Sequence, residues 1–524
     1  MRGLLPSLSP LFSRSFYHIS IRKITILSME EPIYIFDSRI IQELYWNHLA
    51  KKSKKEVEMI LSRRNFLTGF GLGLTGLHFG PKKGALSFGL SEKKSETLLI
   101  KDPDHPEPAP VGYDRLPLTW YKQTVERLKN KAAEQGVDCI VIGDSWNMTY
   151  FTGNFMTKTE RPCWCVFPVK EDAIFWYSPG LDNELVKSWW STGMEYYYDF
   201  PHARGGYPDQ GKVVKGNTVN LFEWLLEGLK KRGFAEKTIG FDSEFTPSQM
   251  KTFTKVLPRA RVIDISPICI RMRMVKTPEE IALIQRAMDY FSQIHAFGRD
   301  YILQRGTDAT DYEIKHACEE YGTNLILQDI KRDGRPHNAV GIRVSIGCRT
   351  GRGTAYAHPN QFHHNRVKKG DSLQISGVVT IGGYGGECYR YYQIAPWDAH
   401  REKVWEVVTE SVRIQERESK AGVKCCDVAY KVHEYQVKQG KDIQKLLYQR
   451  VGHGQGMEGH QPPYIALGDQ TVLEEGMTFS VEPGLFDPEN GFGYNPSDCL
   501  LVTKKKGVLM SSVPYSKEWM FLKL

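Results

Sequence analysis

Four short segments in the second half of the chain contain the residues most suited to chemistry. His358 lies in AYAHPN, and Glu387 ends the glycine-rich stretch GGYGGE. His453 and His460 stand among glycines in GHGQGMEGH, and Glu482 interrupts an apolar run in FSVEPG. A carboxylate is costly to bury unless it meets a cation, a metal ion or several donors, and glycine lets backbone approach a ligand closely. These residues predict a site where imidazoles act as acid and base.

Each of these residues also has a simpler structural explanation. A lone buried histidine is commonly a hydrogen-bonded core residue, and a lone glutamate in a strand is commonly half of a salt bridge. Four such segments in this order are hard to explain by four independent structural roles. We therefore expect the segments to converge on one site.

Residues 116–270 show helix and strand patterns in alternation. An amphipathic stretch at 119–135 stops at Gly136, and a continuous apolar run typical of a buried strand follows it. Alternation of this kind predicts an α/β domain. The expected elements are helices at 119–135 and 219–232, and strands at 138–142, 163–169, 173–178 and 237–242.

Residues 271–524 have a different pattern. Thr277 is expected to cap a helix that begins at Pro278, with Glu279 and Glu280 in its first turn, where acidic side chains oppose the helix dipole. Long helical patterns then alternate with glycine-rich strand pairs, which predicts an α+β domain that contains all four segments. The expected helices are 278–303, 308–321, 400–419 and 425–439, and the expected antiparallel strands lie within 371–394 and 476–503.

The motifs of this second region resemble those of one known family. GHGQG followed by HQPP, EEGMTFSVEPGLF and VKTPEEIALIQRA are similar to segments of the pita-bread hydrolases, which include methionine aminopeptidase, Xaa-Pro peptidases and creatinase. The resemblance covers roughly residues 115–524. It implies an α/β creatinase-type N-terminal domain, an α+β pita-bread catalytic domain and the hydrolysis of a C–N bond.

The metalloenzymes of that family hold two divalent metal ions through five side chains, and this chain departs from that set. By the resemblance, the five positions fall on Ser376, Glu387, His453, Glu482 and Ser497, so serines stand at two positions where carboxylates are expected. A pair of divalent ions needs several carboxylates to balance its charge. The sequence therefore argues against a dinuclear centre and favours no cofactor, while a single divalent metal stays open.

Creatinase has the same fold and works without metal, which makes it a second parallel. Its acid–base histidine falls on His358, whereas its hairpin glutamate falls nearer Tyr389 than Glu387. His460 matches the second, proton-shuttling histidine of the peptidases, and Arg161 matches loosely an arginine for a substrate carboxylate. The residues expected to be catalytic are His358, Glu387, His453, His460 and Glu482, and those expected to bind substrate are Arg161, Tyr389 and Arg390.

The resemblance leads to the hypothesis of a metal-independent hydrolase. Its substrate would be a small cationic or zwitterionic molecule, or a dipeptide-like one. An Xaa-Pro peptidase-like metalloenzyme with an altered metal site, a lyase on the same fold and a non-catalytic binding protein are the alternatives. The family commonly forms dimers, so we expect a homodimer.

Residues 59–90 carry a pattern typical of a twin-arginine export signal. Arg63 and Arg64 precede an uncharged run at 66–80 that is rich in glycine and leucine, and a basic Pro-Lys-Lys segment follows. The run is too short and too weakly apolar for a transmembrane helix. We therefore expect the twin-arginine export machinery as a partner and a periplasmic or otherwise exported protein.

Other interpretations of the N-terminal region stay open. Residues 1–26 are rich in serine and arginine and lack acids, as in a mitochondrial presequence. Residues 1–58 are expected to be an extension from a start codon assigned too early, because Met59 lies just before the paired arginines. A cytoplasmic location follows if the export interpretation fails. Residues 91–115 are expected to form a linker or an extended arm.

The composition limits the class of protein. The chain has 524 residues, of which 41% are hydrophobic and 12% aromatic, which is enough for packed cores and argues against broad disorder. The net charge of +8 is mild, and no basic face with interleaved aromatics points to a nucleic-acid partner. Ten cysteines form no CxxC pair. We expect unpaired buried thiols, with one or two disulfides if the protein is exported.

Overall fold

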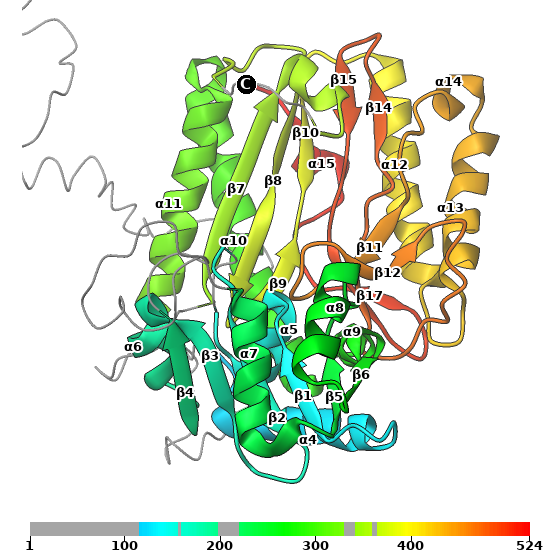
Figure 1. The fold of residues 1–524 in the computed structure, drawn as a ribbon. Helices are drawn as coiled ribbons and strands as arrows, with labels where there is room; N and C mark the ends of the chain where they lie inside the picture. Colours follow the sequence, from blue (N-terminus) through cyan, green and yellow to red (C-terminus); the bar gives the residue numbers. More distant parts are fainter. Residues whose placement is uncertain (1–114, 156–158, 198–219, 330–340, 359–363) are drawn as a thin grey trace, which may run out of the picture. The chain divides into compact units, whose positions relative to one another are not determined.

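The computed structural model describes residues 115–155, 159–197, 220–329, 341–358 and 364–524 (Figure 1). The expected N-terminal extension, export signal and linker lie outside these residues, apart from the last residue of the linker. In the part of the chain that is described, no helix combines the length and the apolar character that crossing a membrane requires.

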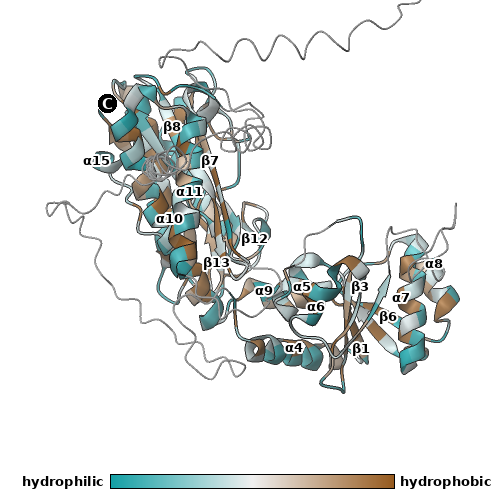
Figure 2. Cartoon of the chain, turned by 90° about the vertical axis from the view of Figure 1, so that its left-hand side faces the viewer, coloured by the Kyte–Doolittle hydropathy of each residue, from teal (hydrophilic) through white to brown (hydrophobic). Residues whose placement is uncertain are grey.

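A six-stranded mixed sheet is the centre of the N-terminal domain (Figure 1). The strands lie in the order β4-β3-β2-β1-β5-β6, with β1 parallel to β5 and antiparallel to β2. The inner strands β1, β2, β3 and β5 are largely buried because their sequences are apolar, which Figure 2 shows as brown segments in the sheet, whereas the edge strands β4 and β6 are mostly partly exposed. This arrangement confirms the α/β class. The elements are α4 (Leu118–Ala133), β1 (Cys139–Ile142), α5 (Ser145–Thr152), β2 (Trp164–Pro168), β3 (Phe175–Pro179), α6 (Asn183–Lys187), β4 (Gly193–Tyr197), α7 (Leu221–Leu229), β5 (Thr238–Phe241), α8 (Pro247–Val256), β6 (Arg261–Asp264) and α9 (Ser266–Met274).

Two five-stranded sheets form the C-terminal domain. One has the order β18-β10-β8-β7 with β9 paired to β8, and the other has the order β12-β11-β13-β16-β17. Helices α10 and α11 pack on the first sheet, and α12 and α13 pack on the second. This confirms the α+β class. The helices are α10 (Pro278–Arg305), α11 (Asp311–Asp329), α12 (Ala399–Glu418), α13 (Cys425–Lys438), α14 (Lys441–Gln444) and α15 (Lys517–Met520). The strands are β7 (Arg343–Thr350), β8 (Ser372–Ile381), β9 (Tyr384–Glu387), β10 (Arg390–Ile394), β11 (Gly452–Gly454), β12 (Gln461–Ile465), β13 (Thr478–Ser480), β14 (Leu485–Asp487), β15 (Phe492–Tyr494), β16 (Cys499–Val502), β17 (Gly507–Leu509) and β18 (Phe521–Leu522).

The helix α10 begins where the sequence predicts. The Thr277 hydroxyl accepts the backbone N–H of Glu280, and the Glu280 carboxylate accepts the backbone N–H of Thr277 at 2.7 Å. This reciprocal capping satisfies two amide groups that would otherwise lack a partner at the helix start. The indole Nε1 of Trp120 in α4 also donates to the Thr277 hydroxyl at 3.1 Å. The cap therefore also ties the first helix of one domain to the first helix of the other.

The helix α11 differs from its prediction. The sequence suggested a helix that ends near residue 321, but α11 continues to Asp329. Its last turns bury Ile326 in the main apolar core. Tertiary packing of this kind extends a helix beyond the point that local pattern indicates.

The cysteines follow the simpler of the two expectations. The ten cysteines, all within the described residues, form no disulfide with one another, and Cys163 and Cys426 are the two that are partly exposed. The remaining thiols are buried and serve as small apolar groups in the cores.

Candidate active site

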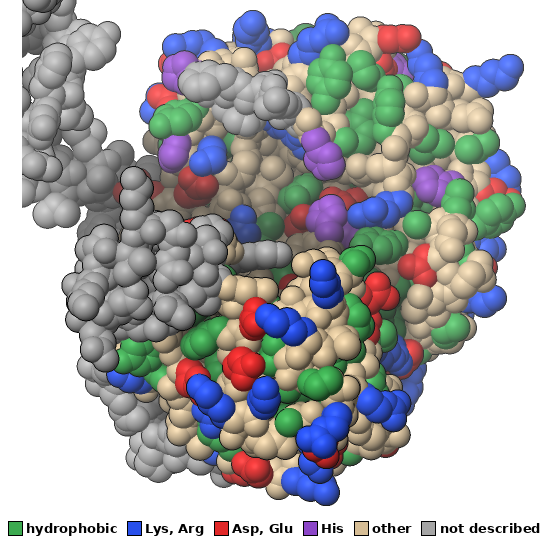
Figure 3. All heavy atoms as spheres, viewed as in Figure 1, with side chains coloured by type: hydrophobic (Ala, Val, Ile, Leu, Met, Phe, Trp, Pro, Cys, Tyr) green, Lys and Arg blue, Asp and Glu red, His purple; other side chains and the backbone are tan. Residues whose placement is uncertain are grey.

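A cavity of about 650 Å³ lies in the C-terminal domain. Figure 3 shows a hollow in this face of the molecule where histidine, acidic and basic side chains lie side by side. Strands β7, β8 and β9 of the first sheet and the segments that flank β11, β12 and β13 of the second contribute to it, so residues far apart in the sequence meet there. Six of the residues named from the sequence line the cavity: His358, Ser376, Glu387, Tyr389, His460 and Glu482.

His453 lies between two glutamates at this site. Its Nε2 is 3.0 Å from Oε2 of Glu482 and 3.7 Å from Oε2 of Glu387, and only 1% of its side chain is exposed. Nδ1 donates to the carbonyl of Gly454 at 3.1 Å, which fixes the ring. Although burial opposes the charge, hydrogen bonding to Glu387 and Glu482 raises the pKa of His453 to about 10. His453 is therefore an imidazolium that shares its charge with two carboxylates.

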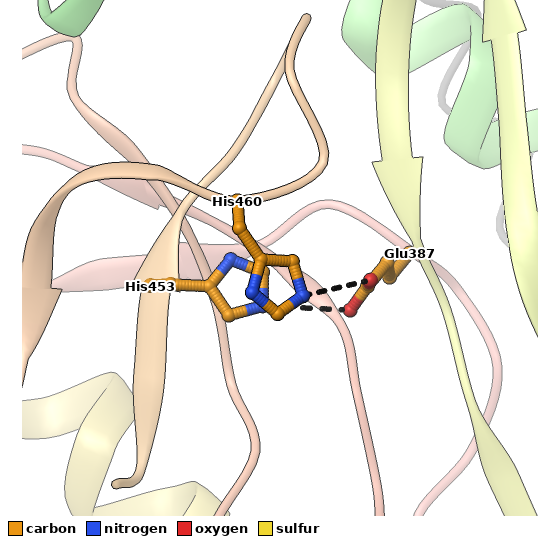
Figure 4. Close-up of side chains that lie close together, drawn as sticks. All are labelled: Glu387, His453 and His460. Carbon is orange, nitrogen blue, oxygen red and sulfur yellow. Dashed lines mark ion pairs between the residues drawn. The ribbon is translucent and has the colours of Figure 1, made fainter. Parts of the chain in front are cut away.

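His460 stacks on His453 but remains neutral. The ring centroids are 3.9 Å apart and the planes differ by 19° (Figure 4). Arg450 donates from Nη2 to Nδ1 of His460 at 3.2 Å, which leaves the proton of the neutral ring on Nε2. That atom is 3.9 Å from Oε1 of Glu387. Burial and the charge of His453 lower the pKa of His460, so His460 presents an N–H donor beside Glu387.

Gln455 holds the strands of the site together, and the sequence analysis missed it. Its Oε1 accepts the backbone N–H of Glu387 at 2.9 Å, and its Nε2 donates to the carbonyls of Phe479 and Asp498. The amide thus joins β9 to β13 and to the residue before β16. The signal was present in the sequence, since a glutamine between glycines in GHGQG is a polar group that burial must satisfy.

His358 and Ser376 both line the cavity but lie in different secondary structure, His358 in an exposed loop and Ser376 in a strand. His358 is an exposed residue shortly after a helical turn that ends at Ala355, and it lines the cavity. Ser376 lies within the long strand β8, and its hydroxyl donates to the carbonyl of Gly347 at 3.4 Å. The histidine is therefore accessible to water, whereas the serine is part of the sheet that forms one wall of the cavity.

Two residues that the sequence suggested for substrate binding lie outside the cavity lining. Arg161 belongs to the N-terminal domain and pairs with the adjacent Glu160 at 2.8 Å. Arg390 is fully buried, and its guanidinium donates to Asp498, to the Ser511 hydroxyl and to backbone carbonyls. All of its described partners belong to the protein interior. Arg390 thus stabilises the fold next to Tyr389 and does not face a ligand.

Ser497 forms an antiparallel bridge with Tyr389 and does not line the cavity. Its hydroxyl is buried and has no hydrogen-bond partner among the described residues. The neighbouring carboxylate, Asp498, turns to Arg390 at 2.7 Å and to the Ser511 hydroxyl at 2.5 Å. Asp498 is therefore already bonded to Arg390 and Ser511, and it does not take the place of the carboxylate that is missing at position 497.

Two arginines of the cavity were not anticipated from the sequence. Arg349 lies near the end of β7, and Arg450 lies just before β11, where its guanidinium stacks 4.5 Å from the ring centroid of Tyr464. A charged residue in the strand segment SIGCRTG was a possible signal for Arg349, because charged side chains are rarely buried without a function or a partner. Nothing in the local sequence indicated that Arg450 would reach the same cavity.

The ligand atoms available at this site limit how many metal ions it can hold. Glu387, His453 and His460 each offer an atom, and these atoms all lie within 4.8 Å of one another. Such a group can surround one divalent ion. A pair of ions carries four positive charges, and the two carboxylates present, Glu387 and Glu482, do not balance them. The residues therefore fit one ion and do not fit two.

The comparisons with known proteins place this geometry in a family. Residues 125–275 match the model of the creatinase/prolidase N-terminal domain, and residues 282–504 match the model of metallopeptidase family M24. The chain is 25% identical over 387 residues to the Xaa-Pro dipeptidase of Lactobacillus delbrueckii subsp. lactis, a match that covers 72% of this chain and 94% of that protein.

Two further relatives extend the likeness over the whole two-domain region. The creatinase of a Bacillus species is 22% identical over 426 residues, which cover 79% of this chain and 96% of that protein. The crystal structure of a prolidase from Thermococcus sibiricus has a TM-score of 0.61 at 18% identity and covers 77% of this chain and 99% of that chain, which shows a shared fold. The chain therefore consists, beyond its N-terminal region, of a creatinase/prolidase N-terminal domain and an M24 domain, and it belongs to the pita-bread hydrolase family.

Proposed function

We propose that this protein hydrolyses a C–N bond in a small cationic, zwitterionic or dipeptide-like substrate without a metal ion. The observation that carries the proposal is the replacement of two carboxylate ligands by Ser376 and Ser497, together with the engagement of Asp498 by Arg390. The relatives named as Xaa-Pro dipeptidase and creatinase support hydrolysis as the reaction class.

His358 is the acid and base of the proposed reaction. It lines the cavity and is exposed, so water can reach its ring. The imidazole takes a proton from a water molecule while the water oxygen attacks the carbon of the C–N bond. The same proton then passes to the nitrogen as the C–N bond breaks, which returns the imidazole to its neutral form.

The other site residues stabilise charges on the substrate during this reaction. Glu387 and Glu482 orient the substrate and face any positive charge on it, since both line the cavity. Nε2 of His453 and Nε2 of His460 lie 3.7 Å and 3.9 Å from Glu387, so both imidazoles stand beside the substrate that Glu387 orients and stabilise negative charge that develops on it. Such preorganised donors act strongly where water is largely excluded.

An Xaa-Pro peptidase-like metalloenzyme with one divalent ion is the second candidate. The observation in its favour is that one possible ligand atom from each of Glu387, His453 and His460 lies within 4.8 Å of the others. Glu387, His453 and His460 would hold the ion. When bound, the ion supplies Lewis acidity toward a substrate carbonyl.

Metal analysis and one substitution separate the two candidates. We expect purified protein to contain less than one equivalent of metal, and its hydrolysis of Ala-Pro or creatine to persist in EDTA. His358→Ala should lower the rate by about two to four orders of magnitude, and His364→Ala, which alters a histidine outside the cavity lining, serves as the control. Activity that EDTA abolishes and Mn²⁺ or Zn²⁺ restores would favour the metalloenzyme.

Two expectations from the sequence stay predictions alongside this function. We propose that the protein is a homodimer, by analogy with the family, and that the twin-arginine signal exports it to the periplasm. Size-exclusion chromatography with light scattering checks the first. Cell fractionation with sequencing of the mature N-terminus checks the second.

A further inference from the structure

Arg349 is a buried cation without an anionic partner among the described residues. Only 8% of its surface is exposed, and it lines the cavity. Of the three other buried arginines among the described residues, Arg273 pairs with Glu458 at 2.8 Å and Arg390 with Asp498 at 2.7 Å, while Arg115 lies over the ring of Trp189. A buried charge is costly unless an opposite charge and hydrogen bonds offset the lost hydration. An anion bound next to Arg349 would therefore stabilise its buried charge, and the described residues do not supply one.

The hydrogen bonds of Arg349 fix its orientation but leave its charge uncompensated. Nε donates to the side-chain oxygen of Gln374, and Nη1 donates to the carbonyls of Tyr356 and Ala357 at 3.1 Å each. Gln374 is held in turn, because its amide donates to the carbonyl of Asn495 at 2.7 Å. All of these acceptors are neutral. Nη2 has no partner among the described residues, so it is the part of the guanidinium that remains for a ligand.

The other charged groups of the cavity do not neutralise Arg349. Glu387 and Glu482 both face the charged ring of His453. Tyr389 is close enough to influence Arg349, but burial raises its pKa well above the usual value, so its hydroxyl stays neutral. Burial lowers the pKa of Arg349 to about 10, which still leaves the guanidinium charged at neutral pH.

We propose that Arg349 is a specificity-determining residue that binds a carboxylate of the substrate through Nη2. The N–H groups of Nη2 can donate a charge-assisted hydrogen bond to a carboxylate oxygen. The inference rests on the proposed function and narrows its substrate class, because it selects acid-bearing zwitterions over purely cationic molecules. The carbonyls of Tyr356 and Ala357 that Arg349 holds directly precede His358, so a carboxylate bound there also places the substrate beside the proposed acid–base residue.

Matched acids and amides test this assignment on the intact protein. Two pairs of probes are used: Ala-Pro and its C-terminal amide, and creatine and its amide. Calorimetry or thermal shift measures how tightly each one binds. We expect at least one acid to bind wild-type protein about tenfold or more tighter than its amide, as a charge-assisted hydrogen bond predicts. An equal response to acid and amide in both pairs would overturn the proposal.

Variants then assign the preference to one arginine. In Arg349→Gln the acid and amide should bind within about twofold of each other, while Arg349→Lys should keep part of the preference because it keeps the charge. Arg450→Gln is the matched control, since it removes the other arginine of the cavity, and it should keep the full preference. A preference that survives in folded Arg349→Gln, or that disappears in Arg450→Gln alone, contradicts the assignment.

The binding readout separates this inference from the proposed function. If no probe is hydrolysed but the acid preference depends on Arg349, the proposed hydrolysis fails and the carboxylate site stands. If the probes are hydrolysed and Arg349→Gln leaves the acid preference unchanged, the hydrolysis stands and the carboxylate site fails. Circular dichroism checks that Arg349→Gln is folded. If that variant does not fold, the comparison rests on Arg349→Lys, in which an acid preference equal to that of wild type would overturn the proposal.

Discussion

Nη2 of Arg390 lies 2.7 Å from Oδ2 of Asp498, and neither side chain is exposed. The pair joins β10 of one sheet to the residue before β16 of the other, so it fastens the two sheets that form the cavity. It also keeps the Asp498 carboxylate away from the site.

Removing one partner of this pair should destabilise the protein strongly. Asp498→Asn leaves the Arg390 guanidinium buried without its counter-charge, which should lower the free energy of unfolding by about 3–5 kcal/mol. Urea unfolding followed by circular dichroism measures the change. Asp442→Asn is the matched control, because Asp442 pairs with Lys403 at 2.9 Å on the surface, and such a pair contributes less than about 1 kcal/mol. Equal losses in the two variants would contradict the structural role.

Restoring carboxylates at the two serine positions should create metal affinity. The double variant Ser376→Asp, Ser497→Glu adds two negative charges to the set that already contains Glu387 and Glu482, which together can balance two divalent ions. After incubation with Mn²⁺ or Zn²⁺ and desalting, elemental analysis should find more metal in this variant than in wild type. The isosteric control Ser376→Asn, Ser497→Gln should bind no more metal than wild type. Two tightly held ions in wild-type protein would refute the underlying argument.

His295 should make the protein less stable in acid. Burial, together with the charge of Arg390, lowers the pKa of this fully buried histidine to about 3. An unfolded chain has a histidine pKa near 6.5, so between these values the unfolded state binds more protons than the folded state. The contribution of neutral His295 to the free energy of unfolding is therefore fully present above about pH 6.5. It is lost as the pH falls toward 3, by at most about 1.4 kcal/mol per pH unit.

A substitution isolates this contribution. His295→Leu cannot take up a proton, so its melting temperature should fall less steeply than that of wild type between pH 6.5 and 4. The variant also loses the contact of Nε2 with the carbonyl of Cys388 at 2.9 Å, so it should be less stable than wild type at pH 7. Differential scanning fluorimetry across a pH series gives both slopes, and parallel slopes would show that His295 does not titrate in this range.

The cap at Thr277 should contribute more than an ordinary helix cap. Thr277→Ala removes the hydroxyl that caps α10 and that also accepts the indole N–H of Trp120. We expect a loss of about 1–2 kcal/mol in the free energy of unfolding. Thr246→Ala is the control, since Thr246 caps α8 with the same reciprocal pattern through Gln249 but is exposed. A loss in Thr277→Ala that is no larger than in Thr246→Ala would argue against an added role of the Trp120 contact.

The sequence by itself was sufficient for features that depend on local pattern. The start of α10 followed from Thr277 and Glu280, because capping involves residues three apart. The segments around His453 and Glu482 identified the family because their motifs are short and contiguous. The substitutions at Ser376 and Ser497 were equally visible, because they follow from residue types at matched positions.

Only the tertiary structure decided what each charged side chain meets. The sequence analysis placed Arg390 among the substrate-binding residues, but the fold turns it inward to Asp498. Arg349 attracted no notice in the sequence, yet strand pairing between β7 and β8 sets it against Gln374 and leaves it in the cavity without an acid among the described residues. The energy of a charge depends on partners that are distant in sequence and on exclusion of water, and neither is encoded in a local pattern.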